Sequence, residues 1–349
     1  MIAKYVLSST RISWGRWIVR DADMEEVEIR KAPHNLALRQ VCAQLTSEIG
    51  DWWLRLILFN FEAPETMLDV LTDLPRKTLS KIRHVRVRGD HVPIMWYRGS
   101  GRERRYRLHS VVKLLPGLRL DELTVLGNLD PVDNYRTLNE LIKEGDGWKK
   151  LRYISHNSEM LGYYDRDAGR SRIQARGRIS EPAHWQSLLR SRDGEYPDHS
   201  VTLYRATIPY YIGAAVDEET REVVEQQLIH RSGDEPVETM TDDSEINKEV
   251  LVVVKRGTGA DYEVGADSRA VTRDIRRILY GREWSEIRVG SISDILGSYD
   301  LPFSYDRSEE FDVIDTVADV YTNVDEYVWT HESDESRLDI PGLAAWCVE

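Results

Sequence analysis

Four six-residue stretches decide the fold of this chain: LRLILF at 54–59, IRHVRV at 82–87, LDELTV at 120–125 and WKKLRY at 148–153. Each stretch has a large apolar residue at its first, fourth and sixth positions. Successive stretches begin about 28, 38 and 28 residues apart, close to the upper end of the range for leucine-rich repeats. The pattern predicts four strands that lie side by side.

Helical patterns separate these stretches. Apolar residues recur at helical spacing in 38–49, 64–74, 108–115 and 133–145. A strand followed by a helix, repeated, predicts parallel strands joined by right-handed crossovers. The longer middle step contains 93–104, which is rich in Gly and Arg and is typical of an inserted loop. Two interpretations stay open: a short, irregular leucine-rich-repeat-like arc, or an ordinary α/β layer with a coincidental period.

The chain divides into five segments by composition. We expect N-terminal strands that cap the sheet at 1–35 and a repeat-like α/β region at 36–160. A linker follows at 161–198, and a second α/β region at 199–297 is packed behind the first. An acidic aromatic tail occupies 298–349. Within the second α/β region we expect a helix that begins at Asp217 and a buried strand at 250–254. The tail is interpreted either as docked over the repeat region or as a disordered arm; its aromatic residues favour docking.

Composition narrows the class of protein. With 41% hydrophobic and 31% charged residues, the 349-residue chain resembles a soluble globular protein, and no apolar run approaches the ~20 residues of a membrane span. The two cysteines indicate no disulfide framework, which favours an intracellular location, cytoplasmic or nuclear. The net charge of −13 argues against a protein that coats nucleic acid.

No motif for catalysis, cofactor binding or metal binding stands out. The nine histidines are dispersed, and neither cysteine has a second ligand at metal-site spacing. Gly257-Thr258-Gly259 follows the strand at 250–254, where a phosphate loop would lie. It lacks the third Gly and the Lys-Ser/Thr ending, and Asp261 follows it. A turn at the end of the strand is the favoured interpretation, and we predict no catalytic, cofactor or metal residue.

A candidate binding surface comes from the alternation of side chains along the strands. Residues between the inward positions face the opposite side of the sheet. The residues that carry the predicted surface are Arg86, Arg88, Leu126, Arg152 and Ile154. Three cations beside an apolar neighbour suit an acidic peptide. The alternatives are a solvated face or internal pairing with the acidic tail of the same chain.

One resemblance adds to this interpretation. The stretch LRQVCAQL at 38–45, the strand at 54–61, Ile82-Arg83-His84-Val85, and the later pieces WQSLL at 185–189 and RDG at 192–194 resemble a large group of uncharacterised fungal proteins described as F-box or F-box-like. The resemblance implies an adaptor that docks on a cullin-type ubiquitin ligase and holds a target with its repeats. However, no Leu-Pro-x-Glu-Ile/Leu box precedes the Cys42 helix, so the chain has no recognisable F-box.

Two functions follow from the sequence. The first is a non-enzymatic intracellular protein-interaction module without cofactors, which binds a protein or acidic peptide. The second is an enzyme whose site lies at the strand ends of the 250–259 region, as open α/β sheets allow.

Overall fold

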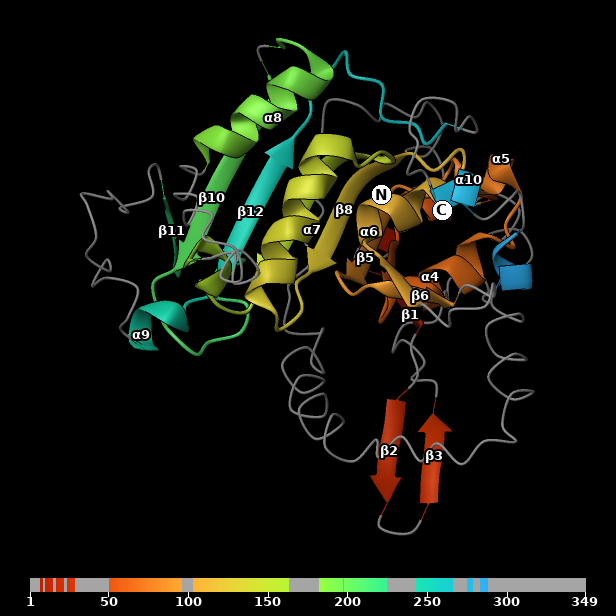
Figure 1. The fold of residues 1–349 in the computed structure, drawn as a ribbon, viewed down its shortest axis with the longest axis horizontal. Coiled ribbons are helices and arrows are strands. Elements are labelled where there is room, and N and C mark those ends of the chain that lie inside the picture. Colours follow the sequence, from red (N-terminus) through yellow and green to blue (C-terminus); the bar gives the residue numbers. More distant parts are fainter. Residues whose placement is uncertain are drawn as a thin grey trace, which may run out of the picture.

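The computed structural model of the chain describes residues 7–8, 10–14, 17–21, 24–28, 50–95, 103–162, 182–196, 198–224, 243–265, 275–278 and 283–287. One eight-stranded sheet dominates it (Figure 1), in the order β1 (Arg11–Trp14), β4 (Leu58–Phe61), β5 (His84–Arg88), β8 (Leu120–Leu126), β9 (Trp148–Ser155), β12 (Val250–Lys255), β10 (Ser200–Ala206) and β11 (Arg221–Val223). The protein is therefore a mixed α/β protein with a large, mostly parallel sheet.

The predicted neighbours pair in parallel, with one shift in register. Val85 pairs with Leu123, and Leu123 pairs with Leu151, as the repeat predicts. In the first stretch Phe59 pairs with Val85, where the repeat places Ile57. The reason is that 52–55 form a 3-10 turn, so β4 begins only at Leu58. A shift of two residues keeps the same side chains on the same face.

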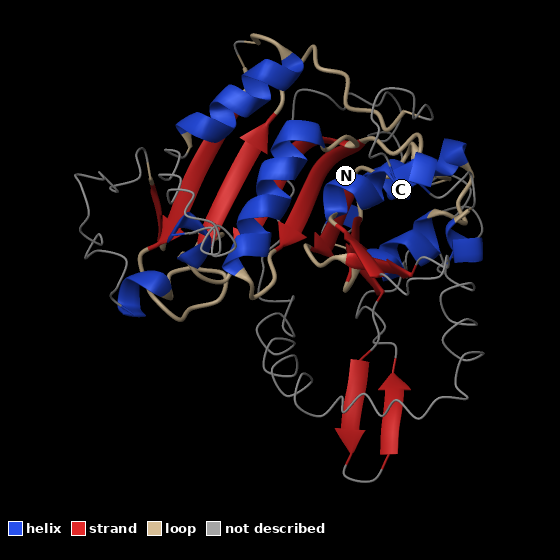
Figure 2. Ribbon diagram, in the orientation of Figure 1, coloured by secondary structure: helices blue, strands red, loops and turns tan. Residues whose placement is uncertain are grey.

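Helices lie against one face of the sheet. They are α4 (Pro64–Leu71), α6 (Leu108–Val111), α7 (Pro131–Glu144) and α8 (Ala183–Asp193). The described chain also contains the short helices α5 (Arg76–Leu79), α9 (Asp243–Ile246) and α10 (Ile275–Ile278), of which α9 lies beyond the amino-terminal end of β12 (Figure 1). Figure 2 shows α6, α7 and α8 in front of the strands. Pro64 and Pro131 occupy the first turns of α4 and α7, where the missing N–H has no intrahelical partner. The helices predicted at 64–74, 108–115 and 133–145 are thus present.

The inward side chains form one core with these helices. Leu68 of α4, Leu108 of α6 and Leu138 of α7 are buried against the sheet, and so are the predicted inward residues of the strands, Phe59, Val85, Val87, Leu123, Val125, Leu151 and Tyr153. At about 25 cal/mol per Å² of apolar surface, burial of this face is the main stabilising contribution to the fold.

Two hairpins stand apart from the main sheet. The segment expected to be an inserted loop forms β6 (Val92–Met95) and β7 (Glu103–Tyr106), which pair antiparallel. The N-terminal strands β2 (Trp17–Asp21) and β3 (Met24–Glu28) form the other hairpin. The first N-terminal strand, β1, instead joins the main sheet, parallel to β4.

The second α/β region does not pack behind the first, which corrects the prediction. Val250 pairs with Ser155 and Lys255 with Lys150, so β12 runs antiparallel to β9 and extends the same sheet. The helix expected to begin at Asp217 is also absent from the described part of the chain, where Arg221–Val223 form β11 instead.

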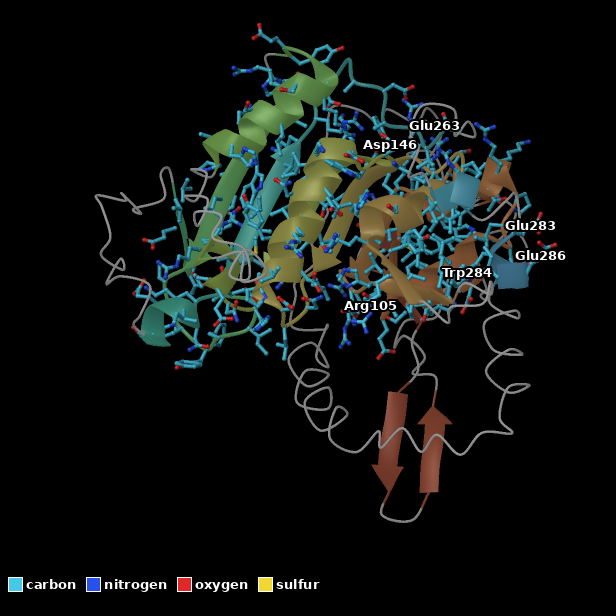
Figure 3. The ribbon with its side chains drawn as sticks, in the orientation of Figure 1. Arg105, Asp146, Glu263, Glu283, Trp284 and Glu286 are labelled. Atoms are coloured by element: carbon cyan, nitrogen blue, oxygen red, sulfur yellow. The ribbon has the colours of Figure 1, made fainter. Side chains whose placement is uncertain are left out.

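Residues that follow β12 in sequence pack against the parallel half of the sheet. Val264 exchanges backbone hydrogen bonds with the 117–118 turn, and Gly147 N donates to the carbonyl of Tyr262 at 2.6 Å. Trp284 reaches back to α4, where its Nε1 donates to Asp69 Oδ1 at 2.8 Å (Figure 3). The tail at 298–349 and the helix predicted at 38–49 lie outside the described residues.

Asn134 of α7 joins the helix to two strands. Its Oδ1 accepts hydrogen bonds from Asn128 N at 2.7 Å and Tyr153 Oη at 2.9 Å, and its Nδ2 donates to the carbonyl of Asn128 at 2.6 Å. A Cβ on Gly127 would lie 2.7 Å from Asn134 Oδ1, so the turn after β8 requires glycine.

We predict that Asn134→Ala lowers the free energy of unfolding by about 2 to 3 kcal/mol, because it leaves buried partners without their hydrogen bonds. Asn139→Ala, on the same helix, is the matched control and should cost less than about 0.5 kcal/mol. Urea unfolding followed by circular dichroism measures both. Equal losses in the two variants would contradict the role of Asn134.

Candidate functional site

The predicted cationic surface exists as a row of side chains but is not open. Asn60, Arg86, Thr124 and Arg152 are register partners across four strands. Arg86 is only 2% exposed, and its Nε donates to Asn60 Oδ1 at 2.9 Å. Arg88 is half-buried. The row therefore lies on the face opposite the helices, as expected, but Arg86 offers no accessible charge.

Glu122 pairs with two further cations of this face, Lys150 and Arg152. Its carboxylate lies 3.0 Å from Lys150 Nζ and 3.6 Å from Arg152 Nη1. Burial alone would raise the pKa of Glu122, but the nearby charges of Arg152, Lys150 and His84 lower it overall. The face is thus paired within the sheet.

The two apolar members of the predicted surface, Leu126 and Ile154, are also covered. Both are 2% exposed and belong to a small second core with Ala214, Ala215 and Leu251. The segment that follows β10 folds back across this end of the sheet. Leu126 and Ile154 are consequently packing residues within the chain, not an exposed surface.

The possible enzyme site at the strand ends of the 250–259 region is occupied by other side chains of the protein. A Cβ on Gly257 would lie 2.3 Å from Tyr196 Cβ, so the aromatic side chain packs directly on the turn. Thr258 N donates to Asp198 Oδ2 at 2.9 Å, which places a carboxylate where a phosphate would bind. An open hollow of about 510 Å³ beside it is lined by Gln186, Arg190, Glu195, Tyr196 and His199.

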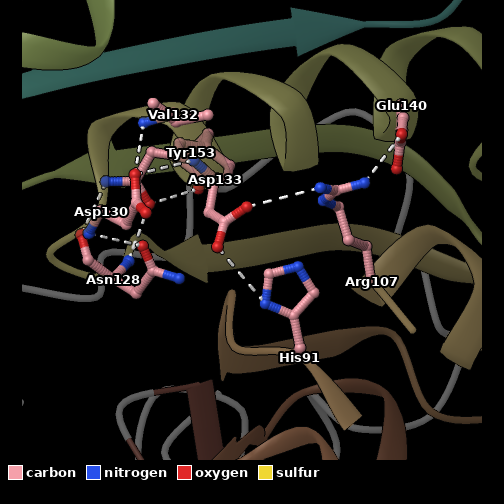
Figure 4. Close-up of polar contacts among 9 residues, drawn as sticks. His91, Arg107, Asn128, Asp130, Val132, Asp133, Glu140 and Tyr153 are labelled. Atoms are coloured by element: carbon pink, nitrogen blue, oxygen red, sulfur yellow. Dashed lines mark hydrogen bonds and ion pairs between the residues drawn. The ribbon is translucent and has the colours of Figure 1, made fainter. Parts of the chain in front are cut away.

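A polar network lies at the carboxyl ends of β5 and β8, beside α7 (Figure 4). Arg107 donates from Nη1 to Glu140 Oε1 at 3.1 Å and from Nη2 to Asp133 Oδ1 at 3.4 Å. His109 Nδ1 lies 3.0 Å from Glu140 Oε2, and His91 Nδ1 lies 3.6 Å from Asp133 Oδ2. These groups bond to one another and fix the β6–β7 hairpin against α7.

Burial shifts the titration of residues at the strand ends. It raises the pKa of Asp90, although Arg88 and His91 oppose the shift. It lowers the pKa of His156 to about 4, so the ring is neutral near pH 7 and Nε2 can accept from Asn157 Nδ2, 3.0 Å away. Perturbed groups often mark functional sites, but burial in a packed loop is a sufficient cause here.

We predict that acid destabilises the protein through His156. The folded-state pKa is depressed, so the full stability is present above the unfolded value of about 6.5 and is lost as the pH falls towards 4. The loss amounts to about 3 kcal/mol at most. Urea midpoints between pH 7 and 4 should fall less steeply for His156→Gln than for the unsubstituted chain; parallel curves would contradict the prediction.

A different surface emerges beside the carboxyl end of β10, on residues 207–220, which connect β10 to β11 and which we call the tyrosine loop. Its inner side is anchored by Glu249, whose buried carboxylate accepts from Gly213 N at 3.2 Å and Ala215 N at 2.9 Å. Thr207 N donates to the carbonyl of Thr220 at 2.9 Å and closes the loop. The loop is therefore held in one conformation.

Part of the outer side of the tyrosine loop is apolar. Among the described residues, the large hydrophobic side chains that remain exposed are Ile208 at 46%, Tyr210 at 72%, Tyr211 at 59% and Val223 at 54%. We call these four residues the exposed apolar set. All lie on the hairpin from β10 to β11. Tyr210 also has φ = 57°, the one positive φ outside glycine in the described chain. Strain of this kind costs about 1–3 kcal/mol and clusters at functional sites.

Sequence reasoning missed this surface because it placed Val223 on a helix and assigned no element to Tyr210 and Tyr211. Asp217, Glu218 and Glu219, followed by Val223 and Val224, matched a helix start with an apolar face. The signal that could have found it is Tyr210-Tyr211 next to Pro209 in a segment without alternation, which is typical of a loop.

We predict that Tyr210→Gly unfolds with a free energy about 1 kcal/mol higher than Tyr211→Gly, because only position 210 has a positive φ that glycine relieves. Both variants remove an exposed tyrosine ring, and Tyr210→Phe, which removes only the hydrogen bond from Asn247 Nδ2 to Tyr210 Oη at 3.0 Å, measures the separate contribution of that bond. Thermal and urea unfolding of the pair provide the measurement. Equal stabilities would show that position 210 carries no strain.

The described part of the chain has neither a metal site nor a membrane-spanning helix. It contains no group of three His, Cys, Asp or Glu side chains that could hold a metal ion. Its helices are all too short or too polar to span a bilayer. Comparison with family models, with curated proteins and with solved structures gives no match.

Proposed function

We propose that the chain is a non-enzymatic, intracellular protein-interaction module that binds a partner protein through the exposed apolar set. The observation that carries this proposal is the gathering of Ile208, Tyr210, Tyr211 and Val223 on one anchored hairpin. Tyrosine supplies a large, rigid contact area with little loss of conformational entropy, and it is enriched at protein interfaces. Anchoring by Glu249 pre-organises the contact and reduces the entropy lost on binding.

The parallel half of the sheet serves as the support for this surface. We interpret it as a short, irregular leucine-rich-repeat-like arc. Successive strands β4, β5, β8 and β9 each add on the same side, and their connecting helices return over one face, which supports the interpretation. Attachment to a ubiquitin ligase has no support among the described residues. An acidic peptide partner loses its basis because Arg86 is buried and Arg152 is paired with Glu122.

The test is partner capture by the full chain from a native lysate, compared between variants. Replacing Tyr210 and Tyr211 together by Ser should reduce capture at least about ten-fold, as expected for interface aromatics that each contribute more than about 1 kcal/mol. Replacement of both by Phe keeps the apolar area and is the matched control, which should retain most of the capture.

The unfolding midpoints of both double variants distinguish a loss of binding from a loss of folding. Tyr210 and Tyr211 are exposed, so neither substitution should change the midpoint strongly. Undiminished capture by the Ser variant would remove the site.

A further inference from the structure

We infer that the partner segment that binds this surface is an extended strand of alternating basic and apolar residues. It adds to the outer edge of β11, opposite β10. The inference rests on the proposed function and specifies its partner. It follows from three features of the β10–β11 hairpin: its place in the sheet, its alternation of side chains and its charge.

β11 is the outermost strand of the sheet in the described part of the chain (Figure 1). Tyr204 pairs with Val223 and Ala206 with Arg221, so one edge of β11 is bonded to β10. The opposite edge presents backbone groups to which a further strand can bond. Extended peptides commonly bind proteins by adding to such an edge.

The side chains of β11 specify what that strand should carry. Glu222 and Val223 are both exposed and, as neighbours in a strand, point to opposite faces. Cross-strand neighbours are favourable when charges are opposite or when both are apolar. A Lys or Arg opposite Glu222 and an apolar residue opposite Val223 satisfy both positions, which gives an alternating basic and apolar sequence.

Charge over the whole hairpin points the same way. Residues 207–224 contain four acidic side chains, Asp217, Glu218, Glu219 and Glu222, all of them exposed. Arg205 of β10, the register partner of Glu222, is ion-paired with Glu245 at 2.7 Å. The one basic side chain within 207–224, Arg221, is also committed. It donates to Glu218 Oε1 and to the carbonyl of Val216, both at 3.1 Å, and its guanidinium lies 4.3 Å from the centre of the Tyr204 ring. With Glu218 paired to Arg221, the other three carboxylates leave residues 207–224 with a net negative charge towards an approaching partner.

The same charge argues against a second copy of this chain as the occupant. A two-fold dimer would place the hairpin of one copy against the identical hairpin of the other. Four carboxylates on each side would then face one another, and like charges directly opposed destabilise a strand pair. A heterologous basic segment avoids this repulsion.

The experiment uses the full chain and two labelled synthetic peptides, one with six Lys-Val repeats and one with six Glu-Val repeats, followed by fluorescence anisotropy. The Lys-Val peptide should bind at least about ten-fold more tightly at low salt, and the preference should shrink as salt screens the charges. Glu219→Lys combined with Glu222→Lys should reverse the preference.

Glu195→Lys, alone or combined with Glu263→Lys, is the matched control for net charge, because both carboxylates lie on other surface segments with side chains 84% and 39% exposed. These controls should keep the preference for the Lys-Val peptide. Loss of the preference in the controls to the same extent as in the Glu219/Glu222 variant would overturn the inference, since net charge would then suffice.

The remaining outcomes distinguish failure of this inference from failure of the proposed function. Tyrosine-dependent capture from lysate with equal affinity for the two peptides would overturn the basic strand and leave the interaction module standing. Capture that is independent of Tyr210 and Tyr211 would overturn the proposed function itself. A measurable dimer that dissociates when Glu222 is replaced by Lys would overturn the choice of a heterologous partner.

Discussion

The structure depends on the burial of one face of the sheet beneath helices that all return on the same side. Phe59, Val85, Leu123 and Leu151 form a continuous apolar row there, and the helices that join the strands supply the opposing layer. Because α4, α6 and α7 all return over the same face and each strand adds beside the last, the second face receives no helix from these connections. What covers that second face has to come from elsewhere in the chain.

The second face is stabilised in two different ways, by polar pairing and by coverage with a loop. Along the middle of the strands, Asn60 accepts a hydrogen bond from Arg86, and Glu122 pairs with both Lys150 and Arg152, so these cations have partners within the sheet. At the carboxyl ends of β8 and β9, the tyrosine loop folds back and buries Leu126 and Ile154 under Ala214 and Ala215. The loop that closes the fold is the same loop that exposes the tyrosines, so its inner and outer sides serve different purposes.

The parallel half of the sheet could be predicted from the sequence because its signal is local and repeated. The 3-10 turn at 52–55 shifted the first pairing by two residues, which hydrophobic spacing cannot detect. The predicted face of Arg86 and Arg152 was also correct, since alternation alone decides it. Their accessibility was not predictable, because it depends on Glu122 from the adjacent strand and on coverage by segments distant in sequence.

The tyrosine loop could not have been predicted, and the reason is Glu249. In the sequence this residue is one of many carboxylates before a buried strand, yet in the structure it is 2% exposed and accepts two backbone hydrogen bonds from the loop. A buried carboxylate is costly unless such bonds compensate it. It is retained together with a positive φ at Tyr210 and two exposed aromatic rings. A positive φ and two exposed aromatic rings on one hairpin, which Glu249 anchors from outside it, support the proposed role in binding.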